Sequence, residues 1–304
     1  MSALRISAPV SDALRQGRPV VALESSVLAQ GLPIPANREA AELMVRAVES
    51  AGAVPAITAV VAGICTLGLT EEELERFLRR DGIRKVAARD LPVAVALGSD
   101  GATTVAASLC IAGAKGIAVF ATGGIGGVHR DAAFDESGDL GELARTPMIV
   151  VCAGAKSILD LPATLERLES LGVPVVGYRT SEMPGFFTRS TGLPLGARAD
   201  SVEDIVRIHL AARALGRPQA TLVVQPPPAE VELPAGTVNE AVVTALGEAR
   251  RSHIRGAAVT PFLLAAVERA TGGRSLRTNL GLLEENAALA GRIAVALKTG
   301  GQPR

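Results

Sequence analysis

Seven apolar runs recur along the chain, and each is long enough for one β-strand. They are apolar at consecutive positions, without the alternation of apolar and polar residues that a strand with one solvated face shows. Strands of this kind have both faces buried, as in a parallel or mixed sheet covered by helices. In chain order the runs are PVVALES, AITAVVAG, VAVAL, GIAVFATG, MIVVCAG, VPVVGY and ATLVVQP.

Segments with a helical pattern separate these runs. Helix-start signals support two of them, namely Thr70 before EEELERFLRR and Pro162 within LPATLERLESLG. The alternation predicts an α/β fold, a three-layer α/β/α sandwich around a mostly parallel or mixed central sheet. It also predicts one domain over residues 1–304, while a barrel built from the same alternation stays open. The helical segments are 36–51, 71–80, 103–114, 162–171, 201–215 and 237–251, with LGLLEENAALAGRIAVALK near the C-terminus.

The composition disfavours a nucleic-acid polymer or a membrane as partner. Thirty-one basic residues balance 31 acidic ones, and aromatic residues make up only 2%, so a basic field and stacking rings are both missing. No apolar stretch has the length of a signal peptide or of a membrane span, which predicts a cytoplasmic protein. Cys65, Cys110 and Cys152 lie among aliphatic or small neighbours, which is typical of small buried hydrophobic residues.

Polar residues cluster at the ends of the apolar runs, where open α/β sheets bind ligands. The first run ends in ALESS, so Glu24 follows a buried strand. Desolvation there favours the protonated carboxyl group that a general acid needs, although a surface salt bridge is the simpler reading. The stretch FATGGIGGVHR carries four glycines, which suit either a phosphate cradle or a plain turn. It matches neither the dinucleotide nor the P-loop pattern.

Three acidic residues follow this glycine stretch. Asp135, Glu136 and Asp139 supply oxygen ligands of the kind that Mg²⁺ and Mn²⁺ prefer. They lack the spacing of a calcium-binding loop, so a solvated acidic loop is the alternative.

Lys156 directly follows the apolar run VVCAGA, where an ammonium group is unusual. If SILDLPATLERL begins a helical segment, the positive end of the helix dipole also disfavours the charged form. A neutral amine is what Schiff-base chemistry requires. The alternative is a lysine whose stem lies along the strand end while its ammonium reaches solvent.

Other polar residues have two readings each. Lys85 binds phosphate or covers a sheet edge, and Thr103 and Thr104 begin a helix, where N-caps and anions both occur. Asn279 can cap the last helix. His209 and His253 read as structural or surface residues.

Eight sequence blocks together resemble the pseudouridine-5′-phosphate glycosidase family, also called the indigoidine synthase A-like family. The resemblance runs from VVALESSVLAQGLPIPAN to TNLGLLEENAALAGRIAVAL, nearly the whole chain. The blocks are ALESSVLAQGLP, IRKVAARDLP, GATTVAAS, FATGGIGGVHR, FDESGDL, VCAGAKSILD, YRTSEMPGFF and TNLGLLEEN.

The resemblance implies reversible cleavage of the C–C glycosidic bond of pseudouridine 5′-phosphate to uracil and D-ribose 5-phosphate. It implies an α/β/α sandwich, a homotrimer, and one Mn²⁺ or similar divalent ion such as Mg²⁺ in each subunit. Lys156 corresponds to the nucleophile that forms a Schiff base with C1′, Glu24 to the proton donor and Asp135 to the metal ligand. The positions that correspond to substrate contacts are Lys85, Val105, Thr122, His129, Ser137, Gly138, Asp139 and Asn279.

Two other hypotheses remain beside this one. A non-catalytic phosphosugar-binding or pigment-pathway accessory protein would use the same fold. An imine-forming aldolase would explain Lys156 but not the order of the blocks.

Overall fold

The computed structural model describes residues 4–130, 134–252, 254 and 259–300. In these residues eleven strands join one sheet, in the order β1-β4-β3-β2-β7-β8-β11-β9-β10, and β6 links β5 to β3. All pairs are parallel except β3–β4 and β3–β6. The strands are β1 Leu4–Ile6, β2 Val20–Leu23, β3 Val54–Val61, β4 Ile64–Leu67, β5 Arg84–Val86, β6 Gly101–Thr103, β7 Val119–Ala121, β8 Ile149–Cys152, β9 Val175–Tyr178, β10 Ala197–Ala199 and β11 Thr221–Val224.

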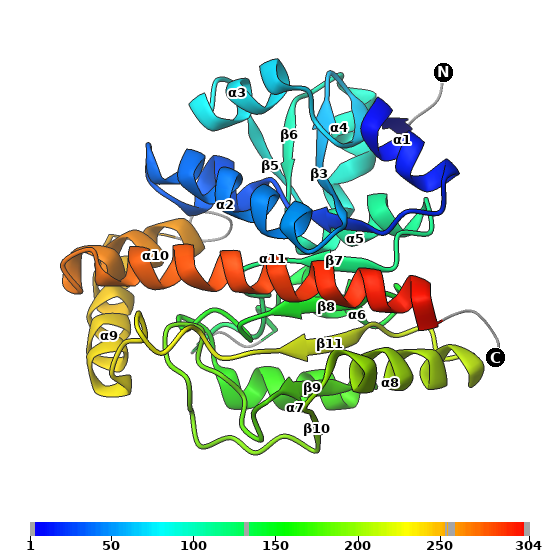
Figure 1. Ribbon diagram of the computed structural model, residues 1–304. Helices are drawn as coiled ribbons and strands as arrows, with labels where there is room; N and C mark the ends of the chain where they lie inside the picture. The colour runs from blue at the N-terminus through cyan, green and yellow to red at the C-terminus, as the bar shows by residue number, and fades with distance from the viewer. Residues whose placement is uncertain (1–3, 131–133, 253, 255–258, 301–304) are drawn as a thin grey trace.

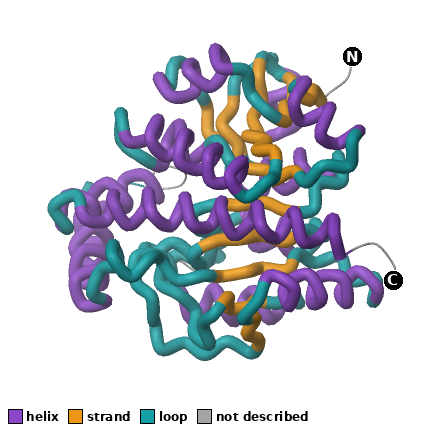
Figure 2. The backbone as a smooth tube through the Cα atoms, in the orientation of Figure 1, coloured by secondary structure: helices purple, strands orange, loops and turns teal. Residues whose placement is uncertain are grey.

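Helices cover both faces of this sheet, which confirms the predicted three-layer α/β/α sandwich with a mixed sheet. Figure 1 shows α2, α8 and α11 on one face, with α5, α6 and α7 behind the strands. Figure 2 shows the strands running between the two helical layers. The helices are α1 Ala8–Arg15, η1 Val27–Gly31, α2 Ala36–Ser50, α3 Glu71–Arg79, η2 Ala88–Asp90, α4 Leu91–Ala96, α5 Val105–Gly113, α6 Gly138–Leu143, α7 Leu161–Ser170, α8 Val202–Ala214, α9 Ala235–Arg251, α10 Val259–Ala270 and α11 Arg274–Gly300.

Six of the seven apolar runs form strands, and the central ones are buried at every position, as β2, β8 and β11 show. The seventh prediction is wrong, because VAVAL lies mostly in α4. Pro92 in the first turn of α4 suits a helix start, and a short apolar run does not by itself distinguish a strand from a helix. Val93 is 48% exposed and Leu97 67% exposed, so most of this run lies outside the core and only Ala94 of it is buried there.

The cysteine and histidine predictions hold in part. Cys152 is buried in β8, and burial raises the pKa of its thiol to about 12. The prediction for Cys110 is wrong, because this residue is exposed on α5. His209 is structural: burial lowers the pKa of its ring to about 4, and Nδ1 lies 3.1 Å from Thr221 Oγ1. His253 lies outside the described residues.

No helix in the described ranges combines the length and the apolar character needed to cross a membrane.

Candidate active site

The predicted site residues gather at the carboxyl ends of three neighbouring parallel strands. Glu24 directly follows β2, and Thr122 directly follows β7. Lys156 follows β8 after three intervening residues. The chain leaves β2 for β3 on one side and later returns to β7 on the other. Ligands bind at such a reversal of strand order in an open α/β sheet, because the loops diverge there and leave a crevice.

Glu24 is held in one orientation by two hydroxyl groups. It is 3% exposed, and its Oε2 accepts a hydrogen bond from Ser26 Oγ at 2.5 Å. Its Oε1 accepts a hydrogen bond from the hydroxyl of Thr122. The hydroxyl of Thr122 therefore positions Glu24, and Thr122 does not line the cavities described below.

Two adjoining cavities meet at Glu24 and Lys156. The polar cavity has a volume of about 340 Å³, and the narrow cavity has about 40 Å³. Residues that line both are Glu24, Ser26, Lys85, Lys156 and Thr260. The polar cavity also contains the predicted residues Val105, His129, Asp135, Ser137, Gly138 and Asp139. The narrow cavity is completed by Val27, Gln30, Gly31, Gly123, Gly124, Phe186, Pro261, Leu264 and Asn279.

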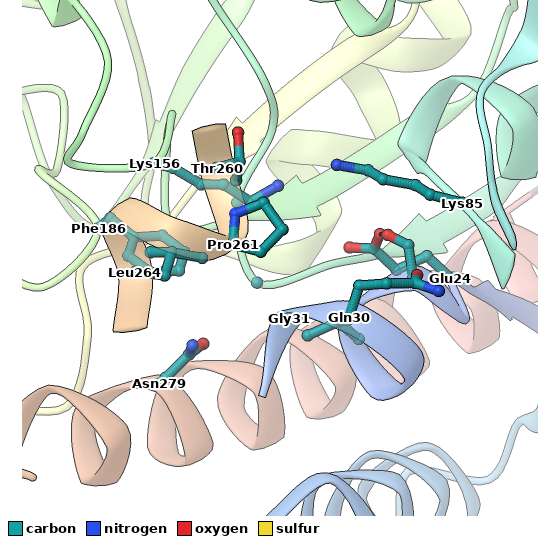
Figure 3. Close-up of a pocket in the computed structure, with 14 residues that line it drawn as sticks. Glu24, Gln30, Gly31, Lys85, Lys156, Phe186, Thr260, Pro261, Leu264 and Asn279 are labelled. Atoms are coloured by element: carbon teal, nitrogen blue, oxygen red, sulfur yellow. Dashed lines mark hydrogen bonds between the residues drawn. The ribbon is translucent and has the colours of Figure 1, made fainter. Parts of the chain in front are cut away.

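Lys85 and Lys156 point toward each other across these cavities (Figure 3). Burial lowers the pKa of Lys85, and the positive charge of Lys156 lowers it further, while Glu24 and Asp139 oppose the shift. Burial and the neighbouring positive charge thus favour the neutral form of Lys85 more than in an exposed lysine. Neutral amines are nucleophilic, so this arrangement suits attack on an electrophilic carbon.

The segment that carries Lys156 is a turn and not the start of a helix. The N–H of Lys156 donates to the carbonyl of Ile125 at 3.1 Å, which holds this turn against the glycine stretch. The expected helix begins only at Leu161, where Asp160 accepts from the N–H of Ala163 at 3.0 Å. The predicted helix dipole at Lys156 is therefore wrong.

The glycines at 123–127 pack against the protein's own chain. A Cβ on Gly124 would lie 2.6 Å from the ring of Phe186, and one on Gly126 would lie 2.2 Å from Ser137 Oγ. The N–H of Ile125 donates to the carbonyl of Gly154, and the N–H of Gly126 donates to Asp139. These donors are already used, so the structure favours the turn over the phosphate cradle.

Asp139 joins three segments that surround the polar cavity. Its Oδ1 accepts from the N–H of Ala106 at 2.9 Å, and its Oδ2 accepts from the N–H of Gly126 at 2.8 Å. Asp139 itself lies in the first turn of α6, where Ser137 is the N-cap. Each oxygen accepts one backbone hydrogen bond, so Asp139 holds the site together.

We expect Asp139→Ala to lower the free energy of unfolding by about 2–4 kcal/mol, because two buried N–H groups would lose a charged acceptor. The measurement is urea denaturation followed by circular dichroism. Ser137→Ala, which removes only a cap, should cost about 1 kcal/mol. Equal losses in the two variants would contradict the joining role of Asp139.

The acidic residues at the rim do not form a multidentate metal site. Asp135 Oδ1 lies 3.0 Å from His129 Nδ1, and Glu136 accepts from Arg167 Nε at 2.8 Å. Across the ranges that the structure describes, no three His, Cys, Asp or Glu side chains are grouped as metal ligands. The carboxylate of Asp135, 53% exposed, lines the polar cavity. It fits a hydrated Mg²⁺ or Mn²⁺, which proteins often hold through one carboxylate and substrate oxygens.

An anion-binding corner lies at the start of α5. Val105 is the first residue of α5, and Thr104, its N-cap, has a buried Oγ1 with no hydrogen-bond partner among the described residues. Lys85 lies on β5, which pairs with the strand leading into α5. A positive helix end beside an ammonium and a free hydroxyl is suited to a phosphate group.

Some lining residues were missed from the sequence, and one role was wrong. Arg89, Arg145 and Thr260 line the polar cavity, and Arg145 and Thr260 lie outside the eight sequence blocks. Arg89 is inside the block IRKVAARDLP, which was the available signal. Asn279 does not cap the last helix, because α11 begins at Arg274; Asn279 lines the narrow cavity instead.

Known proteins resemble this chain over nearly its whole length. A family model described as "indigoidine synthase A like protein" matches residues 9–296. A curated protein from Gemmatimonas aurantiaca named pseudouridine-5′-phosphate glycosidase is 64% identical over 296 residues, which cover 97% of each chain. One of the same name from Herpetosiphon aurantiacus is 50% identical over 299 residues, covering 98% of this chain and 99% of the relative.

Two solved structures share the fold. The prealnumycin C-glycosynthase AlnA, solved in complex with ribulose 5-phosphate, has a TM-score of 0.90 at 40% identity. An indigoidine synthase A-like protein from Thermotoga maritima has a TM-score of 0.89 at 37% identity. Each comparison covers 98% of this chain and 97% of the other. The resemblance seen in the sequence blocks is thus confirmed, and the chain is an enzyme of the indigoidine synthase A-like family.

Proposed function

We propose that this enzyme reversibly cleaves the C–C glycosidic bond of pseudouridine 5′-phosphate to uracil and D-ribose 5-phosphate. The observation that carries the proposal is the meeting of Lys156, Lys85 and buried Glu24 at one pair of cavities. Relatives at 64% and 50% identity bear the name of this activity, and a structural neighbour binds a pentose phosphate. A non-catalytic accessory protein would not need a hydroxyl-oriented carboxylate facing two amines.

The sugar phosphate would occupy the polar cavity. Its phosphate would bind Lys85, the hydroxyl of Thr104 and the start of α5, which places the ribose toward Lys156. His129 and the Ser137–Asp139 segment line the same cavity and would surround the sugar. The uracil would then enter the narrow cavity, which has apolar walls formed by Phe186 and Leu264.

The chemistry at C1′ requires an electron pair that can expel the base, because a carbon of uracil is a poor leaving group. Nζ of Lys156 attacks C1′, and the ring oxygen O4′ leaves and takes up a proton. The nitrogen lone pair then forms a C1′ iminium as the bond to uracil C5 breaks, and C5 accepts a proton. Water hydrolyses the iminium to ribose 5-phosphate and frees the amine, so one water is consumed in each cleavage.

Glu24 is suited to move these protons. It lies at the junction of the two cavities, where the bond between sugar and base would lie. The hydroxyls of Ser26 and Thr122 hold its orientation.

We also propose that Asp135 holds one Mn²⁺ or Mg²⁺ at the rim of the polar cavity. When bound, such an ion would neutralise phosphate charge and keep its remaining waters. His129, beside Asp135, would fix the orientation of that carboxylate.

We expect Asp135→Ala to raise the Mn²⁺ concentration for half-maximal activity at least about tenfold, since loss of even an outer-shell partner has an effect of that size. The measurement is initial rate against Mn²⁺ concentration after chelation. Glu136→Ala is the matched control, because Glu136 lines the same cavity but pairs with Arg167. Equal shifts in both variants would remove Asp135 from the metal site.

The test of the function is condensation of uracil with ribose 5-phosphate by the wild-type protein. The expected product lacks the H5 proton of uracil in its NMR spectrum, because the sugar is bonded to C5. A product that keeps H5 is an N-glycoside and would refute the proposal. Cleavage of ribose 5-phosphate into shorter sugars without uracil would instead identify an aldolase.

The homotrimer and the cytoplasmic location stay predictions. Light scattering after size exclusion measures the first, and fractionation of cells measures the second.

A further inference from the structure

The narrow cavity contains two polar side chains that form no part of the proposed chemistry. Gln30 enters from η1, and Asn279 points into the cavity from α11 (Figure 3). The same two residues, with Gly31, Pro261 and Leu264, also line a further cavity of about 300 Å³. The narrow cavity therefore adjoins additional space on the side where Gln30 and Asn279 lie.

The carboxamide of Gln30 has a defined orientation. Its Nε2 donates to the backbone carbonyl of Ile83 at 3.3 Å, and a carbonyl oxygen can only accept, so the other atom must be Oε1. Oε1 is buried and has no hydrogen-bond partner among the residues that the structure describes. Oδ1 of Asn279 is in the same situation. Buried acceptors without donors destabilise a fold, so two of them at one cavity point to a ligand that brings donors.

Uracil bonded through C5 has two such donors. N1 and N3 both carry hydrogen in the C-glycoside and in free uracil, whereas the N-glycoside keeps hydrogen on N3 alone. We propose, on the basis of the function above, that Gln30 determines base specificity: its Oε1 accepts a hydrogen bond from a ring N–H of the uracil. Phe186 and Leu264 would contact the ring faces, which are apolar, and Gln30 recognises an N–H donor on the ring edge.

Gln30→Met tests the proposal, because methionine keeps the length of the side chain and removes the acceptor. We expect the KM for uracil in the condensation reaction to rise about 10- to 100-fold, while the KM for ribose 5-phosphate stays within about twofold. Borohydride trapping of ribose 5-phosphate on the protein should be unchanged, because the sugar site is intact.

Gln219→Met is the matched control. Gln219 also has a buried Oε1 without a partner among the described residues, but it lies between α8 and β11 and lines neither active-site cavity. Its KM values should equal those of the wild type. An unchanged KM for uracil in Gln30→Met would overturn the proposal, as would equal increases in both KM values.

A separate experiment distinguishes failure of the proposed function from failure of the proposal for Gln30. If the wild type does not condense uracil with ribose 5-phosphate, calorimetric titration with uracil in the presence of ribose 5-phosphate still tests base recognition. Weaker uracil binding by Gln30→Met than by Gln219→Met would support Gln30 on its own, and equal binding would refute it.

Discussion

Lys156→Ala should lower the rate of uracil release from pseudouridine 5′-phosphate by at least about 10³-fold, the largest effect expected of any single substitution here. The amine is the group that would bond to C1′, and the methyl group of alanine has no lone pair with which to replace it. Lys85 cannot take over, because it reaches the cavity from the opposite side, beside the proposed phosphate corner (Figure 3).

Borohydride reduction separates the nucleophile from a binding role. With ribose 5-phosphate, the wild type should gain the mass of one reduced sugar phosphate on the peptide that contains Lys156, and Lys156→Ala should gain none. Lys85→Met is the control: its KM for ribose 5-phosphate should rise, yet saturating sugar should still label Lys156. Labelling at Lys85 in the wild type would show that Lys85 is the nucleophile in place of Lys156. Lys85 is a candidate because its pKa is lowered.

Glu24→Gln should lower kcat by about 10²- to 10⁴-fold, the usual contribution of a positioned general acid or base. Glutamine has the same shape and can still accept from one of the two hydroxyls of Ser26 and Thr122, so the fold should be kept. The carboxamide cannot deliver a proton to uracil C5, so cleavage slows while the sugar site remains.

The matching measurement is trapping of ribose 5-phosphate on Glu24→Gln. Formation of the adduct with Lys156 should continue, although uracil release is nearly lost. Thr122→Val, which removes one hydroxyl from Glu24, should reduce kcat by a smaller factor, about tenfold. Full activity of Glu24→Gln would exclude Glu24 from proton transfer.

Local patterns were sufficient for most of the long elements, although α10 was missed, and insufficient for most of the short ones. The helical pattern at 71–80 became α3 with the expected cap: the Thr70 hydroxyl accepts from the N–H of Glu73, and the Glu73 carboxylate accepts from the N–H of Thr70. Strands of three residues such as β5 and β6 were missed, because so few residues show no periodicity. They exist because they pair with each other and, through β6, with β3.

The sequence predicted which residues form the site better than it predicted what each residue does there. Glu24 and Lys156 were named from their positions after buried strands, and both face the same cavities. Asp139 was named as a substrate contact and a possible metal ligand, and its oxygens also accept hydrogen bonds from two backbone N–H groups. A contact between residues 106 and 139 leaves no mark in either local sequence, so only the folded chain reveals that Asp139 is engaged.

The sequence by itself determined the buried parallel strands, the family and the identity of the amine and carboxyl groups at the strand ends. These properties follow from apolar runs and short motifs, which act over a few neighbouring residues. Only the tertiary structure decided that Thr122 orients Glu24, that Lys85 faces Lys156 and that the Oε1 of Gln30 is left without a donor. Each of these depends on residues 53 to 98 positions apart in the sequence being brought within hydrogen-bonding or Coulombic reach. The order and pairing of the strands bring these residues together, and no local pattern encodes them.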